Sequence, residues 1–467
     1  MTDHRTIPTA APLSDAAGIA ARIDRIPTGR FHVRLASKLA LGTFFDGFDA
    51  ISLAVVLSLV VATFKISFAE AGTIIAAGYL GQFIGAIVIG WLSERFGRKK
   101  TFVISLIVFS LLSIGCAFAW SATSLLVFRL LQGLGLGAEV PLAGTLINEY
   151  LGRKSRGRVA VLYQSAFSWG LFFAPLIALV FTSTLAPDIA WRVLLAVGFL
   201  PIIVAIWAAV ALPESARWLA TRGRHAEANA YVEQMEAEAK ARGVVLDPPQ
   251  VLPTQEHKKF RPAELFSGIY GKRTLTLGLL WFTGYFVVYG YSVWLPSLYV
   301  QVGGLAASSS VLLTILIGLI VIAMNYVTAW LVERIGRKKT LVIGFSIAAF
   351  GGLYGLFCVG VLGNTSWPIL FSTGCLIALG ITVPAGALYF YTGELYPTRM
   401  RGFATSSASS LARLASVVSP FIIGPLLDTG GAATIFGVLG GVALLGTIVV
   451  AVAGVETRNR SLEEISA

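Results

Sequence analysis

Long apolar stretches alternate with short polar segments along almost the whole chain. Each stretch is about twenty residues long or longer, the length of helix that crosses the hydrocarbon core of a bilayer. The pattern therefore predicts an all-α membrane protein with twelve transmembrane helices, six before and six after a polar stretch at 213–273. The predicted spans cover residues 35–62, 71–92, 101–119, 124–148, 158–183, 191–212, 274–300, 308–331, 340–361, 367–391, 404–426 and 432–454.

The two halves of the chain repeat each other. The loop after the second span, Glu94-Arg-Phe-Gly-Arg98-Lys-Lys, recurs after the eighth span as Glu333-Arg-Ile-Gly-Arg337-Lys-Lys. An acidic and a basic residue after the fourth span also return after the tenth. This second repeated set is Glu149 with Arg156 and Glu394 with Arg401. Two copies of a six-span unit predict a transporter of two pseudo-symmetric lobes that works by alternating access.

The same pattern divides the chain into five predicted parts. These are an N-terminal tail (1–34), a six-helix lobe (35–212), a linker with short helices (213–273), a second six-helix lobe (274–455) and a C-terminal tail (456–467). Lys and Arg gather in the loops after the second, fourth, eighth and tenth spans, so the positive-inside rule places both termini in the cytoplasm. The first 30 residues lack the apolar core of a signal peptide, and we expect the first span to be retained.

Composition supports a membrane protein and argues against other classes. The chain is 56% hydrophobic and only 13% charged, whereas soluble domains are nearer a quarter charged. Its net charge of +12 lies in short bursts between apolar spans, which argues against nucleic-acid binding. The three cysteines fall within or at the ends of spans and the four histidines lie outside them, so we expect no metal site.

Five charged residues lie at least five positions inside the ends of the predicted spans, where a charge costs roughly 2.5–3.5 kcal/mol on insertion scales. Asp46 and Asp49 are three residues apart in the first span and share one helix face. Arg129 and Glu139 belong to the fourth span and Arg413 to the eleventh. The two aspartates and Arg413 have no charged counterpart in the other half, so scaffold symmetry does not explain them.

The repeated loops resemble the signature of the major facilitator superfamily. Gly90-Trp-Leu-Ser-Glu94-Arg95-Phe-Gly97-Arg98-Lys99 fits its loop between helices 2 and 3, with Glu94 where Asp is common. Pro213-Glu-Ser-Ala-Arg-Trp after the sixth span is similar to the sugar-porter and metabolite–proton symporter branches. The resemblance covers nearly the whole chain and implies the twelve-helix major facilitator fold.

A narrower resemblance is to the bacterial niacin transporter group, relatives of synaptic vesicle glycoprotein 2. The pieces that carry it are Phe45-Asp-Gly-Phe-Asp49, Gly133-Leu-Gly-Leu-Gly-Ala-Glu-Val-Pro141, Trp281 to Pro296, Leu388-Tyr-Phe-Tyr391 and Arg413. Related aromatic-acid and sugar symporters share part of this pattern. The resemblance implies a bacterial transporter of a small organic acid.

Asp49 and Arg129 match the pair that couples proton movement in the sugar-porter symporters that the chain resembles. An Asp whose contact with an Arg changes between two states would gain and lose a proton during the cycle. The alternative is a static ion pair that orders helix packing. Asp46 is either a second proton site or a hydrogen-bonded structural acid.

Arg413 suggests recognition of an anion, because a guanidinium binds a carboxylate bidentately and stays charged. Trp281, Tyr285 and Tyr289 recur every fourth residue and form one aromatic stripe, which fits either a wall for a flat ring or ordinary packing. Glu139 either lines the cavity or satisfies the helix loosened by Pro141. Further candidates for a central cavity are Trp294, Gln164, Trp169, Asn325, Tyr389 and Tyr391.

The repeated loop charges are candidates for a gate at the cytoplasmic rim. Positive-inside topology explains the basic residues but not the glutamates, so we expect ion pairs that close the inner mouth in one state. The predicted gating residues are Glu94, Arg95, Arg98, Glu149, Arg156, Glu333, Arg334, Arg337, Glu394 and Arg401.

These features predict a proton-coupled importer of nicotinate or a similar aromatic carboxylate in the bacterial inner membrane. We expect it to work as a monomer in lipid, on a small-molecule substrate and protons, with the proton gradient as energy source and no cofactor. The alternatives are a sugar–proton symporter, an organic-cation carrier and a transport-inactive receptor or scaffold. No nucleophile constellation or Walker sequence is present, so we expect neither an enzyme nor an ATP-driven pump.

Overall fold

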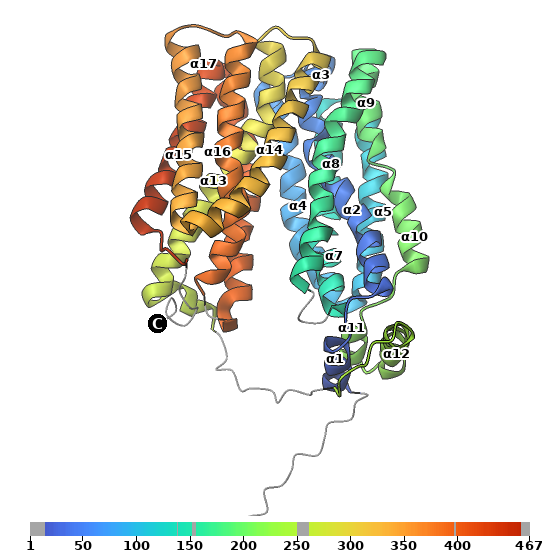
Figure 1. The fold of residues 1–467 in the computed structure, drawn as a ribbon. Coiled ribbons are helices and arrows are strands. Elements are labelled where there is room, and N and C mark those ends of the chain that lie inside the picture. The colour runs from blue at the N-terminus through green and yellow to red at the C-terminus, as the bar shows by residue number, and fades with distance from the viewer. Residues whose placement is uncertain (1–14, 138, 152–155, 250–260, 397, 459–467) are drawn as a thin grey trace, which may run out of the picture.

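The computed structural model describes residues 15–137, 139–151, 156–249, 261–396 and 398–458. Throughout these ranges the regular structure is helical. The helices form two lobes that stand side by side, the first coloured blue to green and the second yellow to red in Figure 1. The upper and lower ends of the bundle are named below as they appear in that view.

The first lobe contains the six predicted spans of the N-terminal half. Its helices are α2 (Arg30–Val55) with α3 (Leu57–Phe64), α4 (Phe68–Phe96), α5 (Arg98–Ala117), α6 (Ala122–Leu136) with α7 (Glu139–Tyr150), α8 (Arg156–Thr184), and α9 (Pro187–Val197) with α10 (Pro201–Ala211). Two spans are thus built from two helical segments each, α2 with α3 and α9 with α10, whereas α6 and α7 belong to one helix, Ala122–Tyr150. The segments α2 and α3 meet at a bend of 51°.

The second lobe contains the other six spans. Its helices are α13 (Gly268–Gln301), α14 (Ala307–Ile335), α15 (Arg337–Gly355) with the π-helical turn η2 (Leu356–Val361), α16 (Trp367–Glu394) and α17 (Thr398–Ala453). The 56 residues of α17 would extend about 84 Å at 1.5 Å per residue, far more than one crossing needs. Gly431, at φ 65° and ψ −168°, breaks this run and divides it into spans 11 and 12.

These helices confirm the predicted twelve-helix fold. Among the described residues, ten helices or bent pairs are long and apolar enough to cross a membrane. Dividing α17 at Gly431 adds one more crossing. The twelfth is α13, whose 34 residues include the Trp and Tyr stripe that lowers its hydropathy.

The lobes repeat one capping device at their lower ends. In the first lobe, Glu214 accepts hydrogen bonds from the backbone N–H groups of Arg98 and Lys99 at the start of α5, at 2.9 and 3.1 Å. In the second lobe, Glu456 binds the first two N–H groups of α15 in the same way, at 2.9 and 3.1 Å. A carboxylate at a helix N-terminus satisfies free donors and complements the helix dipole.

Each capped turn also requires a glycine. Gly97 and Gly336 precede these helices with φ of 103° and 92°, a region that L side chains rarely adopt. A Cβ at Gly97 would lie 2.2 Å from Glu214 Oε2, and one at Gly336 would lie 2.5 Å from Glu456 Oε2. The glycines of the repeated loops therefore make room for the capping glutamates.

Helices outside the bundle gather under the first lobe (Figure 1). They are α1 (Ala16–Asp24), α11 (Ala216–Thr221) and α12 (His225–Ala241), while η1 (Pro262–Phe266) precedes α13. The predicted tail at 1–34 thus contains a packed helix and the start of α2, and α13 begins six residues before the predicted boundary at 274. The helices at these two boundaries therefore extend beyond the apolar stretches from which the boundaries were predicted.

Ion pairs hold α1 against the linker helices. Arg22 and Arg25 of α1 and its C-cap both contact Glu236 of α12, at 2.9 and 2.6 Å. Asp24 pairs with Arg217 of α11 at 2.8 Å. Burial acts to raise the pKa of Glu236, but hydrogen bonds and charge from the two arginines outweigh it and the pKa lies below its ordinary value.

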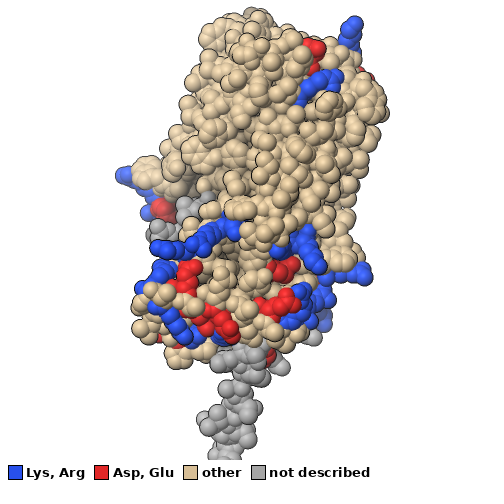
Figure 2. Space-filling model, turned by 90° about the vertical axis from the view of Figure 1, so that its right-hand side faces the viewer, with Lys and Arg blue, Asp and Glu red and all other residues tan. Residues whose placement is uncertain are grey.

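Charged side chains are concentrated at the lower end of the molecule, as Figure 2 shows for the face of the first lobe. Above them extends a broad band of uncharged side chains, with a few charges again at the upper end. Such a band is the surface that a bilayer solvates, and burying charge in it would be costly.

The lobes contact each other closely in their upper halves through α4 and α17. A Cβ at Gly72 would lie 2.4 Å from Pro420 O, and one at Gly424 would lie 2.4 Å from Phe68 O. Asp428 of α17 also accepts hydrogen bonds from the N–H groups of Phe68 and Ala69 at the start of α4, at 3.0 and 2.8 Å. Small residues therefore bring the two backbones together at the upper end.

Candidate substrate and proton site

The ionisable residues of the predicted spans lie in the interior of the bundle. Asp46, Asp49, Arg129 and Glu139 are all buried, and Arg413 is half-buried. The first four belong to the first lobe and Arg413 to the second, and Asp46 and Arg413 are close enough for their charges to interact across the lobe interface.

Asp49 and Arg129 form a buried, hydrogen-bonded ion pair. Arg129 Nη1 donates to both carboxylate oxygens of Asp49, at 3.0 and 3.2 Å, and to Gln132 Oε1 at 2.8 Å. Gln132 in turn donates to Asp49 Oδ1 at 3.1 Å and to Ser113 Oγ at 2.7 Å. Arg129 Nε is buried and has no hydrogen-bond partner among the described residues. The guanidinium therefore keeps one unused donor.

Glu139 is wholly buried beside α2. It is the first residue of α7, and its Oε1 lies 3.3 Å from Thr43 Oγ1. Thr43 Oγ1 also lies 2.8 Å from the hydroxyl of Tyr163. Gly42 leaves room for the carboxyl, because a Cβ there would lie 2.5 Å from Glu139 Oε1. Glu139 interacts electrostatically with Asp46, for which the described residues offer no hydrogen bond.

Arg413 links the two lobes. Its Nη1 donates to Gln82 Oε1 of α4 at 2.9 Å. Tyr285, Tyr289 and Tyr389 lie close enough to interact with its charge. These tyrosines are half-buried or, for Tyr389, 52% exposed, so the group around Arg413 is accessible. The arrangement joins a fixed cation with aromatic rings and hydroxyl groups.

The aromatic stripe of α13 forms as the sequence predicts, but its members differ in depth. The rings of Trp281 and Tyr285 stack at 5.3 Å and 9°, and Tyr285 and Tyr289 lie 6.2 Å apart. Tyr389 meets Trp281 edge-on at 4.7 Å. Trp281 is wholly buried and its Nε1 donates to Thr392 Oγ1 at 2.9 Å. It therefore supports the tyrosines from behind and does not itself form an exposed wall.

Three predicted cavity residues lie elsewhere. Trp294 is buried near the upper end, where its ring meets Phe68 of the other lobe at 6.0 Å. Tyr391 is buried, and its hydroxyl exchanges hydrogen bonds with the backbone of Val455 at 2.9 and 2.7 Å. Trp169 is exposed beside other rings of α8. The side chain of Gln164 lies outside the described part of the structure.

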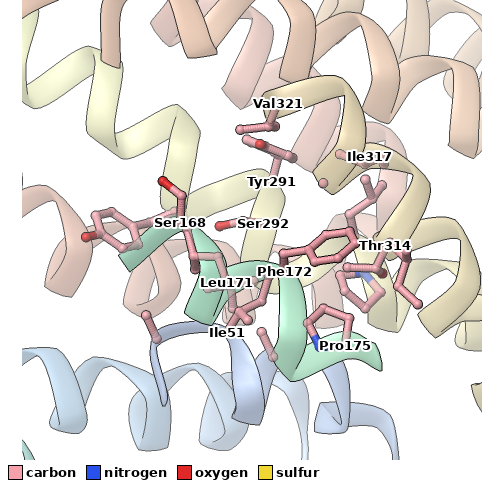
Figure 3. A pocket seen from close by; sticks show the side chains of 18 of the residues that line it. Ile51, Ser168, Leu171, Phe172, Pro175, Tyr291, Ser292, Thr314, Ile317 and Val321 are labelled. Atoms are coloured by element: carbon pink, nitrogen blue, oxygen red, sulfur yellow. The ribbon is translucent and has the colours of Figure 1, made fainter. Parts of the chain in front are cut away.

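A cavity of about 190 Å³ separates α8 of the first lobe from α13 and α14 of the second (Figure 3). Of the predicted substrate residues whose side chains the structure describes, Tyr289 and Asn325 line it and Arg413 and Glu139 do not. Its walls are Phe172 and other apolar groups, with Ser168, Ser292 and Thr314 adding hydroxyls. An apolar cavity of about 150 Å³ holds benzene, so this one has room for a ligand with a single ring.

A second, much smaller pocket of about 10 Å³ adjoins the ion pair. Its lining includes Asp49, Arg129, Gln132, Gln82 and Tyr79. That volume is close to the minimum for one water molecule, and the polar lining supplies the partners such a water needs. Tyr79 lines both this pocket and the larger cavity, so its ring separates the two spaces.

The predicted rim charges form ion pairs, but each pair stays inside one lobe. Arg98 contacts Glu94 and Glu149 at 2.9 and 3.3 Å, and Arg337 contacts Glu394 at 2.7 Å. Within the described side chains, no ion pair joins the two lobes. The pairs therefore brace helix ends within a lobe, because partners from opposite lobes do not meet in this conformation.

The remaining predicted rim residues make different contacts or lie outside the description. Arg95 lies over the rings of Trp91 and Phe96, and Arg334 lies over Trp330 at 4.9 Å. Glu333 is exposed. The side chains of Arg156 and Arg401 lie outside the described part of the structure.

Several site residues do not stand out in the sequence, because they are uncharged or because their partners lie far away along the chain. Gln82 and Gln132 are amides inside apolar spans, which is a usable signal, but each reads as helix packing until its partners are known. Glu456 follows the last span as Glu214 follows the sixth, yet the two local sequences differ. Their equivalence becomes visible only from the helix ends that they cap.

The described residues contain no group of three or more His, Cys, Asp or Glu side chains placed to hold a metal ion. Two repeated six-helix lobes with buried charges at their interface define a membrane carrier of the major facilitator fold.

Comparison with known proteins identifies the family. The family model described as "Sugar (and other) transporter" matches residues 35–467, so the chain belongs to this transporter family of the major facilitator superfamily. It is accordingly a multi-pass membrane transporter and not an enzyme.

Among curated relatives, the niacin transporter NiaP of Acinetobacter baylyi is 35% identical over 96% of this chain and 99% of its own length. A gallate transporter of Pseudomonas putida is 31% identical over 90% of this chain and 91% of its own length. Among solved structures, a partially occluded inward-open form of the Escherichia coli xylose transporter XylE superposes with a TM-score of 0.71 at 18% identity, covering 90% of this chain and 98% of that one.

Proposed function

We infer that the protein is a proton-coupled importer of a small organic acid, with nicotinate or a similar aromatic carboxylate as the best-fitting substrate. It would work as a monomer in the bacterial inner membrane, with both termini and the lower end in the cytoplasm. The proton gradient supplies the energy, and no cofactor takes part. The relatives named for niacin and gallate transport support an aromatic acid.

The single observation that carries this proposal is the group around Arg413. A guanidinium at the lobe interface, with three tyrosines around it, suits a flat ring that bears a carboxylate. The carboxylate would bind Arg413 bidentately, and the ring would lie along Tyr285 and Tyr289. Because arginine stays charged, this site would bind the anion throughout the cycle.

Asp49 and Arg129 are the proposed proton-coupling pair, and Asp46 is the proposed second proton site. The pair is buried and bonded in this conformation. A change in lobe position that draws Arg129 away would leave Asp49 an unpaired buried carboxylate, which favours proton uptake. Return of Arg129 would release that proton on the other side.

The rim charges remain the proposed gate at the cytoplasmic end. In the present conformation they pair within each lobe, which is the arrangement expected when that end is open. Closing it would bring the two capped ends, at Arg98 and Arg337, toward each other.

A sugar is the second candidate substrate, and one observation favours it. The cavity of about 190 Å³ has mostly apolar walls with several hydroxyls and one amide, and no charged side chain lines it. Such a lining suits a neutral polar ligand better than an anion. The fold shared with xylose transporters is compatible with this candidate.

A thermal-shift screen of the purified protein separates these candidates. Nicotinate should raise the melting temperature, whereas nicotinamide, which has the same ring but no carboxylate, should not. Stabilisation by a hexose alone would overturn the aromatic-acid proposal. Uptake of radiolabelled nicotinate into proteoliposomes with an imposed pH gradient distinguishes a carrier from a transport-inactive receptor.

A further inference from the structure

Gln82 is the one buried amide in contact with both lobes at the level of the charged residues in the described structure. Its Oε1 accepts the hydrogen bond of 2.9 Å from Arg413, which belongs to the opposite lobe. Gln82 is 6% exposed, so the acceptor side of this bond is shielded from water, whereas Arg413 is half-buried. A hydrogen bond between a charged donor and a buried neutral acceptor contributes to holding the two elements together.

The same side chain borders the proton-coupling pair. Gln82, Asp49 and Arg129 all line the pocket of about 10 Å³. Gln82 lies four residues after Gly78 and so shares its helix face, and a Cβ at Gly78 would lie 3.6 Å from Arg129 Nε. That Nε–H is the buried donor without a partner among the described residues. The Arg129 Nε–H thus needs a hydrogen-bond acceptor, and the Gln82 amide lies close to it.

Aromatic rings frame this amide on the cavity side. Tyr79, one turn before Gln82 on α4, meets Tyr289 of α13 at 4.9 Å across the lobe interface. Tyr79 lines both spaces, and its hydroxyl donates to Ala50 O at 3.2 Å. The ring pair therefore keeps the larger cavity apart from the amide and the ion pair.

We propose that Gln82 is a substrate-operated latch that couples Arg413 to the Asp49–Arg129 pair. This inference rests on the proposed function. In the empty site, Gln82 Oε1 holds Arg413. A substrate carboxylate displaces it, because an anion that accepts two hydrogen bonds from the guanidinium outcompetes a neutral amide oxygen that accepts one. The freed amide turns into the small pocket and accepts the unused Nε–H of Arg129.

The switch needs no covalent step, only the exchange of one acceptor between two arginines. It releases the lobe-to-lobe hydrogen bond and changes the surroundings of the proton-coupling pair in a single movement. The titratable or charged groups that face this region are Asp46, Asp49, Tyr79, Cys116, Arg129, Glu139, Tyr289 and Arg413. Gln82 itself does not titrate, so it acts as a positioning residue.

The first test compares two transport modes in proteoliposomes containing the full chain. Gln82→Met preserves side-chain length but removes the acceptor. We expect nicotinate counterflow to stay within about threefold of wild type, whereas accumulation driven by a pH gradient falls more than about tenfold. Gln82→Glu should weaken nicotinate binding more than about tenfold, because a carboxylate would occupy Arg413 permanently. Gln234→Met, an exposed glutamine on α12, is the matched control.

The second test needs no substrate. Spin labels at Lys100→Cys and Lys339→Cys, with the native cysteines replaced by alanine, report the distance between the lower ends of the lobes. Gln82→Met removes the hydrogen bond to Arg413. In the protein without substrate, it should therefore change the ratio of conformations with separated and approached lower ends by at least about fivefold. Gln234→Met should leave the ratio unchanged.

The outcomes separate the latch from the proposed function. Wild-type accumulation by Gln82→Met, or equal loss of counterflow and accumulation, overturns the latch. If the wild-type protein neither binds nor exchanges nicotinate, the proposed function fails. The spin-label distances in wild type and Gln82→Met then test the latch by themselves. Unchanged distances then overturn the latch, and shifted distances support it for another ligand of Arg413.

Discussion

At the scale of single residues, the interior charges differ in how completely they are paired. Asp49 accepts hydrogen bonds from Arg129 and Gln132, whereas Glu139 leaves Oε2 without a partner in the described structure. Breaking a buried ion pair by removing one partner costs about 3–5 kcal/mol, because a charge is left without compensation. Substitutions at these positions should therefore retain size and hydrogen bonding.

Asp49→Asn tests the proton-coupling role with such a substitution. The amide still accepts from Arg129 but cannot carry a proton, so accumulation of nicotinate driven by a pH gradient should fall more than about tenfold while counterflow persists. Uptake into proteoliposomes under the two conditions measures this. Gradient-driven accumulation at the wild-type level would exclude Asp49 as the coupling site.

Arg413→Lys tests recognition of the carboxylate. Lysine keeps the charge but loses the planar pair of donors, so nicotinate affinity should fall about tenfold or more. Isothermal titration with nicotinate measures the change. Lys99→Arg, at the lower end of the bundle, controls for a general effect of exchanging basic side chains. Equal affinity of Arg413→Lys and wild type would place the carboxylate elsewhere.

At the scale of elements, the fold relies on devices that tie helix ends to distant segments. Glu214 and Glu456 cap α5 and α15, and Glu236 holds α1 against α12. Each of these three contacts joins residues that are more than 100 positions apart in the chain. Together these contacts fix the positions of the helix ends. Apolar packing alone would not determine where each helix ends along the bundle.

Gly336→Ala should destabilise the second lobe by about 1–3 kcal/mol, because alanine is strained at φ 92° and its Cβ would displace Glu456. Thermal unfolding of the purified protein measures the loss. Gly441→Ala is the control, since its Cβ would meet no atom within 4 Å and alanine favours the helix. Equal melting temperatures for the two variants would contradict the proposed steric conflict at Glu456.

Glu236→Gln should loosen α1 from the linker helices. Removing the charge weakens both arginine contacts, and amide hydrogen exchange in residues 16–24 should accelerate about tenfold. Glu233→Gln on the exposed face of α12 should have little effect.

The pH dependence of α1 docking follows from the same contact. Because folding lowers the pKa of Glu236, its contribution is complete above the ordinary value of 4.5 and is lost as pH falls through the lowered folded-state pKa. If α1 stays docked to the same extent at a pH below the folded-state pKa of Glu236, the ionised Glu236 does not hold α1 in place.

At the scale of the whole molecule, the lobes are joined in their upper halves and each braces its own lower end. The upper contact combines close glycine packing with the carboxylate of Asp428 at the N-terminus of α4. The intralobe ion pairs at Arg98 and Arg337 leave the lower ends free to approach or separate. Two lobes joined by contacts that can break are what alternating access requires.

Asp428→Asn should weaken the upper contact, because an amide interacts less favourably than a carboxylate with the positive end of a helix. The ratio of conformations should shift by about twofold to fivefold toward separation of the upper ends. Distances between spin labels placed on the upper ends of α4 and α17 measure this. An unchanged distribution would mean that glycine packing alone holds the lobes together.

The sequence by itself determined the class of fold and the inventory of interior charges. Apolar length predicted the spans, and the repeated loops predicted two lobes, because both properties depend on residues close together in the chain. The same local signal located Asp49, Arg129 and Arg413 at bilayer depth. It could not tell Trp281, which lies behind the tyrosines, from Tyr289, which lines the cavity.

Only the tertiary structure decided which of these groups meet. The contact of Gln82 with Arg413 joins residues 331 positions apart, and the rim charges pair within lobes although their sequences allow pairing between them. Helix rotation and lobe position set these partners, and both depend on packing summed over the whole bundle. The pattern along one helix predicts on which face of the helix a side chain lies. It does not predict which neighbouring helix packs against that face.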